Sequence, residues 1–180
     1  MVERGKLFDL CQVRKLKEGE VIKSFNCGDK ELNDFLINKA DKYKKSLLSV
    51  SYVLEKENCP IAYFSLSNDS LSHERFDKQS SFNRLNRNID NDKRMRQYPA
   101  VKIGRFAVAE IYKQMGVGQY LLSLIKSSMI VDQKSGCRFI TVDAYNDAIA
   151  FYQKNGFVML NEFQKGRRTQ PMFFDLAQLT

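Results

Sequence analysis

The feature that most constrains this chain is a strand–loop–helix unit between Gly104 and Leu122. The run Gly104–Val108 is mostly apolar, the loop after it contains Gly116 and Gly118, and an amphipathic stretch follows at once. The first N–H groups of a helix have no partner within the helix, and the helix dipole gives that end a partial positive charge. A glycine loop that opens into a helix therefore predicts an anion site, suited to phosphate.

Two common phosphate motifs do not fit this loop. A P-loop needs the string GxxxxGK[ST], which does not occur in the chain. A dinucleotide fingerprint needs a third glycine where this chain has Leu121, and it belongs near the first strand rather than past mid-chain. The backbone N–H groups of Gln114–Gln119 can still bind a pyrophosphate.

The remaining periodicity predicts one α/β domain over residues 1–180, with a mixed, mostly antiparallel central sheet flanked by helices. Asp29 is a plausible N-cap for a helix that begins at Lys30 and carries apolar residues up to Ala40. Further helices are expected at Val117–Gln133 and Asp147–Lys154. Strands are expected at Phe8–Leu16, Val50–Glu55, Ile61–Leu66, Tyr98–Val108, Cys137–Asp143, Phe157–Leu160 and Met172–Leu176.

Residues 67–97 interrupt this pattern, because they are poor in aliphatic side chains and rich in polar ones. Their basic residues cluster toward the end of the segment: Arg84, Arg87, Lys93, Arg94 and Arg96. A connection this long within a domain is either functional or mobile. We expect a basic insertion that is either a solvated loop with some helical turns or a segment that contacts the substrate.

The net charge, the cysteine and histidine content and the lack of long apolar runs limit which class of protein this chain can be. The formal net charge is +8, which favours polyanionic partners such as nucleic acid or phosphorylated ligands. Four dispersed cysteines and a single histidine, His73, make a poor metal set, so no metal is expected. No run of 18 apolar residues and no apolar signal core occur, so we expect a cytoplasmic protein without a membrane span.

Three segments together resemble the GNAT family of N-acetyltransferases. They are the strand Arg105–Val108, the loop Lys113–Gly118 with its helix, and the later run Asn146–Phe157, which contains Phe151-Tyr152-Gln153-Lys154-Asn155-Gly156-Phe157. The family has a Q/R-x-x-G-x-G/A loop, followed downstream by an N-x-x-A-x-x-FYxKxGF-like segment. Lys113 departs from the family pattern by standing where Gln or Arg is usual, and it keeps a positive donor near the loop.

The resemblance implies transfer of an acetyl group from acetyl-CoA, as co-substrate, to a primary amine. It implies that the backbone of Phe106, Ala107 and Val108 pairs with the pantetheine arm. It implies that Tyr152 is the general acid that protonates the leaving thiolate, and that Asn146 contacts pantetheine or supports the site. The implied pyrophosphate loop comprises Lys113, Gln114, Met115, Gly116, Val117, Gly118 and Gln119.

The acceptor and the base stay open at this point. Glu110 is the nearest carboxylate to the strand, and a surface role suits it better than a base. An α-amine, with a pKa near 8, needs less help to lose its proton than a lysine amine does. The absence of an obvious base therefore leans toward α-amine acceptors.

The stretch Phe25–Leu36, with Cys27-Gly28 followed by Leu32, Phe35 and Leu36, is similar to the first helix of acetyltransferase toxins that modify aminoacyl-tRNA. That branch implies tRNA and an antitoxin as partners. Three hypotheses are retained: a toxin-like enzyme, an N-acetyltransferase for another amine, and a non-catalytic acetyl-CoA-binding module. An exposed sheet edge would also permit a homodimer.

Overall fold

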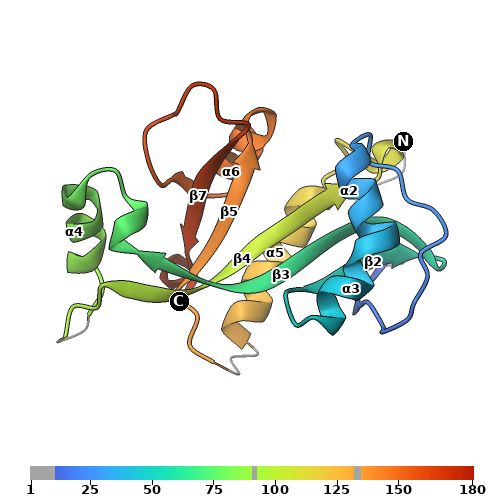
Figure 1. Cartoon of the computed structure of the whole chain (residues 1–180), viewed down its shortest axis with the longest axis horizontal. Helices are drawn as coiled ribbons and strands as arrows, with labels where there is room; N and C mark the ends of the chain where they lie inside the picture. Colours follow the sequence, from blue (N-terminus) through green and yellow to red (C-terminus); the bar gives the residue numbers. More distant parts are fainter. Residues whose placement is uncertain (1–10, 91–92, 132–134) are drawn as a thin grey trace. The chain divides into compact units, whose positions relative to one another are not determined.

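The computed structural model describes residues 11–90, 93–131 and 135–180. It divides into two compact units (Figure 1). Unit 1 holds the chain up to Ser67 together with Ile103–Leu124, and unit 2 holds Asn68–Lys102 with Ile125–Thr180.

Seven strands are hydrogen-bonded in the order β1-β2-β3-β4-β5-β7-β6. The strands are β1 (Cys11–Lys15), β2 (Val50–Lys56), β3 (Cys59–Ser72), β4 (Gln97–Val108), β5 (Phe139–Tyr145), β6 (Val158–Met159) and β7 (Thr169–Asp175). The pairs β1–β2, β2–β3, β5–β7 and β6–β7 are antiparallel. The predicted mixed, mostly antiparallel α/β fold is confirmed. Residues 8–10 of the first predicted strand lie outside the described residues, as do the residues expected to end the helix that starts at Val117.

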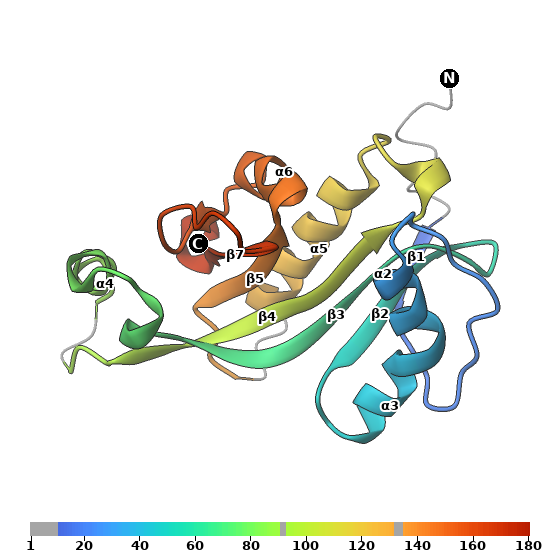
Figure 2. The same ribbon diagram turned by 45° about the horizontal axis from the view of Figure 1, so that its top comes forward.

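In unit 1 a helical run lies beside strands β2 and β3 (Figure 2). It consists of α2 (Lys30–Asp34), a π-helical turn η1 (Phe35–Lys39) and α3 (Ala40–Lys45). The predicted N-cap is confirmed, because the Asp29 carboxylate accepts hydrogen bonds from the N–H groups of Glu31 (2.8 Å) and Leu32 (3.0 Å). One face of this run is buried in the core of unit 1 with β2, β3 and the end of β4.

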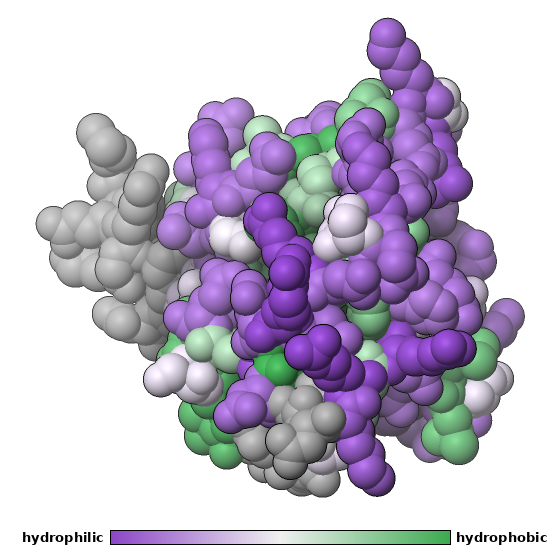
Figure 3. Space-filling model, turned by 90° about the vertical axis from the view of Figure 1, so that its left-hand side faces the viewer, coloured by the Kyte–Doolittle hydropathy of each residue, from purple (hydrophilic) through white to green (hydrophobic). Residues whose placement is uncertain are grey.

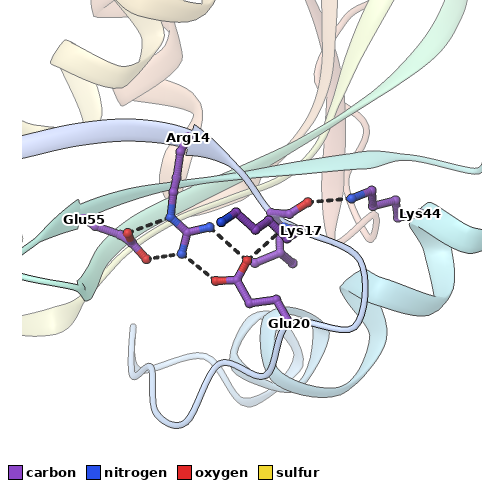
Figure 4. A network of polar contacts seen from close by, with 6 residues as sticks. Arg14, Lys17, Glu20, Lys44 and Glu55 are labelled. Carbon is purple, nitrogen blue, oxygen red and sulfur yellow. Dashed lines mark hydrogen bonds and ion pairs between the residues drawn. The ribbon is translucent and has the colours of Figure 1, made fainter.

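An ion network supports the same unit (Figure 4). The Arg14 guanidinium donates hydrogen bonds to both carboxylate oxygens of Glu55, at 2.7 and 2.6 Å, and to both of Glu20, at 2.9 and 2.5 Å. The hydrogen bonds from Arg14 hold the pKa of Glu20 below its usual value. Bidentate hydrogen bonds of this kind fix the relative position of the groups they join, so the loop before α2 is tied to the antiparallel strands β1 and β2.

In unit 2, the helices are α4 (Gln79–Arg87) and α6 (Ile149–Lys154), with short 3-10 turns η2 (His73–Arg75), η4 (Asn146–Ala148) and η5 (Leu176–Leu179). The helix α5 (Val117–Val131) has residues in both units. Phe82 of α4 is buried in a cluster with Tyr98, Phe139 and Phe173. None of the helices in the described part of the chain is long and apolar enough to cross a membrane.

The expected loop at residues 67–97 is wrong in part. Strand β3 continues to Ser72, and α4 covers nine residues of the segment. Near the end of β3, Asp69 accepts hydrogen bonds from the buried Thr141 hydroxyl and from Arg75 Nη1, the latter at 2.8 Å. Burial alone would raise the pKa of Asp69, but these hydrogen bonds outweigh it and the pKa lies below its usual value.

Candidate functional site

Backbone hydrogen bonds hold the chain where it leaves β4 in unit 1. The N–H of Ala109 donates to the carbonyl of Ile61 at 2.8 Å, and the N–H of Glu110 donates to the carbonyl of Asn26 at 2.9 Å. A short 3-10 turn, η3 (Glu110–Tyr112), follows. The start of the glycine loop is therefore anchored to both β3 and the segment that precedes α2.

The loop itself contains two residues in the left-handed region. Gln114 has a φ of 63° and Gly116 a φ of 86°. This conformation costs a residue with a side chain about 1–2 kcal/mol, so Gln114 is held there by the surrounding structure. A Cβ atom on Gly116 would meet nothing within 4 Å, and this glycine is needed for its backbone angle rather than for space.

Helix α5 begins immediately after Gly116. Its hydrogen-bond ladder starts with the N–H of Tyr120, which donates to the carbonyl of Gly116 at 3.0 Å. The N–H groups of Val117, Gly118 and Gln119 precede that ladder and lie at the positive end of the helix dipole. The first turn carries no acidic side chain. Backbone donors and a partial positive charge at a helix N-terminus are features that bind anions, and the anion site stays a prediction for this end of α5.

Two charged side chains of the loop lie beside the turn that precedes α2. A Cβ atom on Gly28 would be 3.3 Å from Oε1 of Glu110 and 3.5 Å from Nζ of Lys113. Lys113 and Glu110 are both exposed. Neighbouring Cys27 is buried, and burial raises the pKa of its thiol, so this cysteine is a poor nucleophile. The proximity of Gly28 to Lys113 was not foreseen from the sequence.

Tyr152 lies on α6 in unit 2, and it is only 5% exposed. Its ring contacts those of Phe151 and Phe157 edge-on, with centroids 5.2 and 5.3 Å away. Burial raises the pKa of the Tyr152 phenol above its usual value, because the phenolate would be poorly solvated. The hydroxyl therefore carries its proton throughout the neutral range.

Asn146, also in unit 2, is exposed at the end of β5 and is held by two hydrogen bonds. Its Nδ2 donates to the carbonyl of Arg167 at 2.8 Å, and its Oδ1 accepts a longer one from Nε2 of Gln170 at 3.4 Å. Gln170 is completely buried and also exchanges two hydrogen bonds with the backbone of Gln164. Sequence reasoning missed Gln170, the second residue of β7.

The predicted site residues thus divide between the units. In unit 1, Ala107 is buried in the core, and Phe106 and Val108 are half-buried at the end of β4. The loop residues there are exposed (Lys113, Gln114, Gln119), half-buried (Met115, Gly116, Gly118) or buried (Val117). Asn146 and Tyr152 belong to unit 2. Among the described residues, no cluster of His, Cys, Asp or Glu side chains could hold a metal ion.

Solved structures share this fold. A bacterial toxin matches with a TM-score of 0.77 and 19% identity, over 94% of this chain and 92% of that chain. AtaT complexed with acetyl-methionyl-tRNAfMet matches with a TM-score of 0.72 and 18% identity, over 94% and 96%. A tyrosine-to-phenylalanine mutant of AtaT, bound to acetyl-CoA and the C-terminus of the antitoxin AtaR, matches with a TM-score of 0.67 and 19% identity, over 95% of this chain and 96% of that chain.

Curated protein sequences contain no significant match to the chain. A family model does match: the acetyltransferase (GNAT) domain aligns with residues 49–159, which include β2 to β6 and all of the predicted site residues. Members of this family use acetyl-CoA as co-substrate. By this match and by its fold, the chain belongs to the GNAT family of acetyltransferases.

Proposed function

We propose that residues 113–119 bind the pyrophosphate of acetyl-CoA through backbone N–H groups. The observation that carries this proposal is the loop geometry in unit 1, where Gln114 and Gly116 are left-handed and α5 begins directly afterwards. The donors that precede the helical ladder, together with the helix dipole, suit a doubly charged anion. Lys113 adds a flexible positive charge at the start of the loop, in place of the Gln or Arg that is usual in the family.

The remaining contacts follow from the order of the elements. The backbone of Phe106, Ala107 and Val108 pairs with the pantetheine arm in the manner of an added strand. Along this strand the side chains alternate between the buried core and the opposite face of the sheet. This alternation fixes the direction in which the backbone N–H and C=O groups point. Asn146 contacts pantetheine or supports the site, with its amide oriented by Gln170 and the Arg167 carbonyl.

Tyr152 is the proposed general acid. Acetyl-CoA supplies an acetyl thioester, whose carbonyl carbon is attacked by the neutral nitrogen of the acceptor amine. As the carbon–sulfur bond breaks, Tyr152 donates its phenolic proton to the departing sulfur. The amine nitrogen loses a proton to solvent, and Tyr152 regains a proton from solvent, so the enzyme returns to its starting state. A phenol whose pKa is raised by burial stays protonated until that step. No covalent intermediate on the protein is needed.

For the acceptor, we propose the α-amine of an aminoacyl-tRNA. The net charge of +8 favours a polyanionic substrate. An α-amine is neutral often enough near pH 7 to react without a dedicated base. The toxin AtaT, which shares the fold, has been solved with acetyl-methionyl-tRNAfMet. We also propose a cytoplasmic antitoxin partner, on the likeness to AtaT bound to AtaR, and a homodimer formed through an exposed sheet edge.

One experiment distinguishes this proposal from two other functions. Purified protein is incubated with acetyl-CoA and three acceptors: charged tRNA, a free amino-acid amide and a lysine peptide. Acetylation of charged tRNA in preference to the others supports the proposal. Equal acetylation of the small amines favours a general N-acetyltransferase. Binding of acetyl-CoA without any acetylated product would mean a non-catalytic binding module.

A further inference from the structure

Five basic side chains on α4 and in the segment that leads into β4 are exposed in unit 2. They are Arg84 and Arg87 on α4, and Lys93, Arg94 and Arg96 in the segment that leads into β4. Within the part of the chain that the structure describes, none of their side chains has an ion pair or hydrogen bond. Residues 79–97 carry a net charge of +3, from five basic and two acidic residues. Their charge is therefore not neutralised within the described protein.

The helix that carries two of these arginines has a fixed orientation. Phe82 is buried, Leu85 packs partly against the same cluster, and the hydroxyl of Tyr98 donates a hydrogen bond to the side chain of Asn86. Arg84 and Arg87 are three positions apart, so they are neighbours on the exposed side of α4. Figure 3 shows strongly hydrophilic side chains gathered on the face of the molecule that it presents.

Hydrogen bonds join the connection before α4 to a second basic loop of unit 2. The N–H of Asp77 donates to Oδ1 of Asn161 at 2.9 Å, and Nδ2 of Asn161 donates to the carbonyl of Arg75 at 2.8 Å. Lys78 and Glu162 form an ion pair at 2.6 Å. The loop 161–168 then continues to the exposed residues Lys165, Arg167 and Arg168.

That loop also reaches a proposed site residue. Gln164 donates to Oδ2 of Asp77 at 3.2 Å, and its backbone is bonded to the buried Gln170. Gln170 and the Arg167 carbonyl in turn hold Asn146. A continuous set of hydrogen bonds within unit 2 therefore runs from the connection before α4, through the loop, to Asn146.

We propose that Arg84, Arg87, Lys93, Arg94 and Arg96 form a surface that binds the phosphate backbone of the RNA part of the substrate. This proposal rests on the proposed function and deepens it. Four of the five residues are arginines, whose planar guanidinium matches two phosphate oxygens at once. Two of the five residues lie on a helix held by core contacts, and hydrogen bonds join the connection before that helix to Asn146, so RNA bound there has a defined position relative to Asn146.

The test measures binding of deacylated bulk tRNA by fluorescence anisotropy at several salt concentrations. The variant Arg84→Gln/Arg87→Gln keeps good helix formers at exposed positions and is expected to remain folded. Each phosphate contact contributes about 0.7–0.9 to the slope of log affinity against log salt, so the slope should fall by about 1.5 and affinity by about tenfold. Arg84→Lys/Arg87→Lys should restore most of the affinity.

The matched control is Lys15→Gln/Lys23→Gln, which removes two exposed charges from unit 1 and should change the slope by less than half as much. Acetyl-CoA binding and acetylation of a small amine are measured on the same variants, and they should match the unmodified protein. An unchanged salt slope in Arg84→Gln/Arg87→Gln would overturn the proposal, as would equal affinity of the unmodified protein for polyglutamate and tRNA. Failure of acetyl-CoA binding would instead contradict the proposed function.

Discussion

Nζ of Lys126 donates a hydrogen bond of 2.5 Å to the carbonyl oxygen of Asn155, the residue that ends the helix carrying Tyr152. The same ammonium lies 3.7 Å from the ring centroid of Phe174 and 5.5 Å from that of Phe157. A positive charge at the C-terminal end of a helix is stabilising, and the aromatic faces add a cation–π attraction. Lys126 therefore fixes the end of α6 close to Tyr152.

Replacing Lys126 with methionine should disturb this arrangement. Burial lowers the pKa of Lys126, which offsets part of the benefit of its charge, so we expect a loss of about 1 kcal/mol in the free energy of unfolding. The rate of acetyl transfer should fall several-fold, while acetyl-CoA binding changes little. Urea unfolding and steady-state kinetics measure both effects. The control Lys154→Met removes an exposed lysine from α6, and a loss equal to that of Lys126→Met would contradict the assigned role.

The proposed general acid gives a second prediction. Tyr152→Phe keeps the ring contacts with Phe151 and Phe157 but removes the proton donor, so kcat should fall by at least about 100-fold. The dissociation constant for acetyl-CoA should stay within about twofold, as measured by calorimetry. Tyr43→Phe is a suitable control, because Tyr43 also packs edge-on against an aromatic ring, that of Phe35 at 5.1 Å. A Tyr152→Phe enzyme with normal kcat would rule out this acid.

The same substitution should change the alkaline stability. Because burial raises the pKa of Tyr152 in the folded state, the phenol in the unfolded state ionises first, near its ordinary pKa of about 10. Stability contributed by this group is fully present below pH 10 and is lost as the pH rises above it. Between pH 9 and 11 the unmodified protein should therefore lose more stability in urea unfolding than Tyr152→Phe does. Parallel losses would mean that Tyr152 ionises equally easily in both states.

The carboxylate of Asp69 should make the free energy of unfolding depend on pH in the acid range, in the direction opposite to that of Tyr152. Its folded pKa is lowered, so its contribution is present above its ordinary pKa, near 4, and is lost as the pH falls through the folded value. Asp69→Asn should cost about 1–3 kcal/mol at pH 7, because the hydrogen bonds from Thr141 and Arg75 lose their charged acceptor. The difference between the two proteins should shrink in acid unfolding measured from pH 5 to pH 2.

Asp143→Asn provides the comparison for Asp69. Asp143 pairs with Lys102 at 2.6 Å, but both side chains are substantially exposed, and such surface pairs contribute about 0.2–1 kcal/mol. We expect little change for Asp143→Asn at either pH. If Asp69→Asn behaves in the same way, the Asp69–Arg75–Thr141 contacts do not stabilise unit 2.

The backbone angle of Gly116 gives a prediction with an internal control. Gly116 and Gly19 both have positive φ angles, 86° and 70°, and a Cβ atom on either would meet nothing within 4 Å. Alanine at either position should therefore cost a similar amount, about 1–2 kcal/mol, through backbone strain alone. Only Gly116→Ala should weaken acetyl-CoA binding, by about tenfold, because only that residue shapes the proposed pyrophosphate loop. Equal binding by both variants would contradict the assignment.

Much of this architecture could be predicted because local signals and tertiary structure agree. Asp29 precedes an apolar helical pattern and does cap α2, and Gly116 directly precedes α5. A helix or strand can be predicted from the sequence when its local preference agrees with the global fold. The strand–loop–helix unit belongs to this class.

The secondary structure of residues 67–97 could not be predicted in the same way. The end of β3 contains Asn68 and Asp69, residue types that disfavour strands, so its pairing depends on neighbouring strands rather than on local preference. The apolar residues Phe82 and Leu85 of α4, with Ile89 just beyond its end, have helical spacing, but the Ser and Asn residues around them are weak helix formers. Contacts with the core of unit 2 decide that this segment is a helix.

The most direct test of the account is to follow both products of one reaction. The protein is incubated with acetyl-CoA and an aminoacyl-tRNA, released thiol is measured, and the aminoacyl group is analysed by mass spectrometry. We predict one N-acetylated α-amine for each free coenzyme A thiol, with both signals reduced about 100-fold in Tyr152→Phe. Thiol release without an acetylated amine, or acetyl-CoA binding without either product, would contradict an N-acetyltransferase that acts on this acceptor.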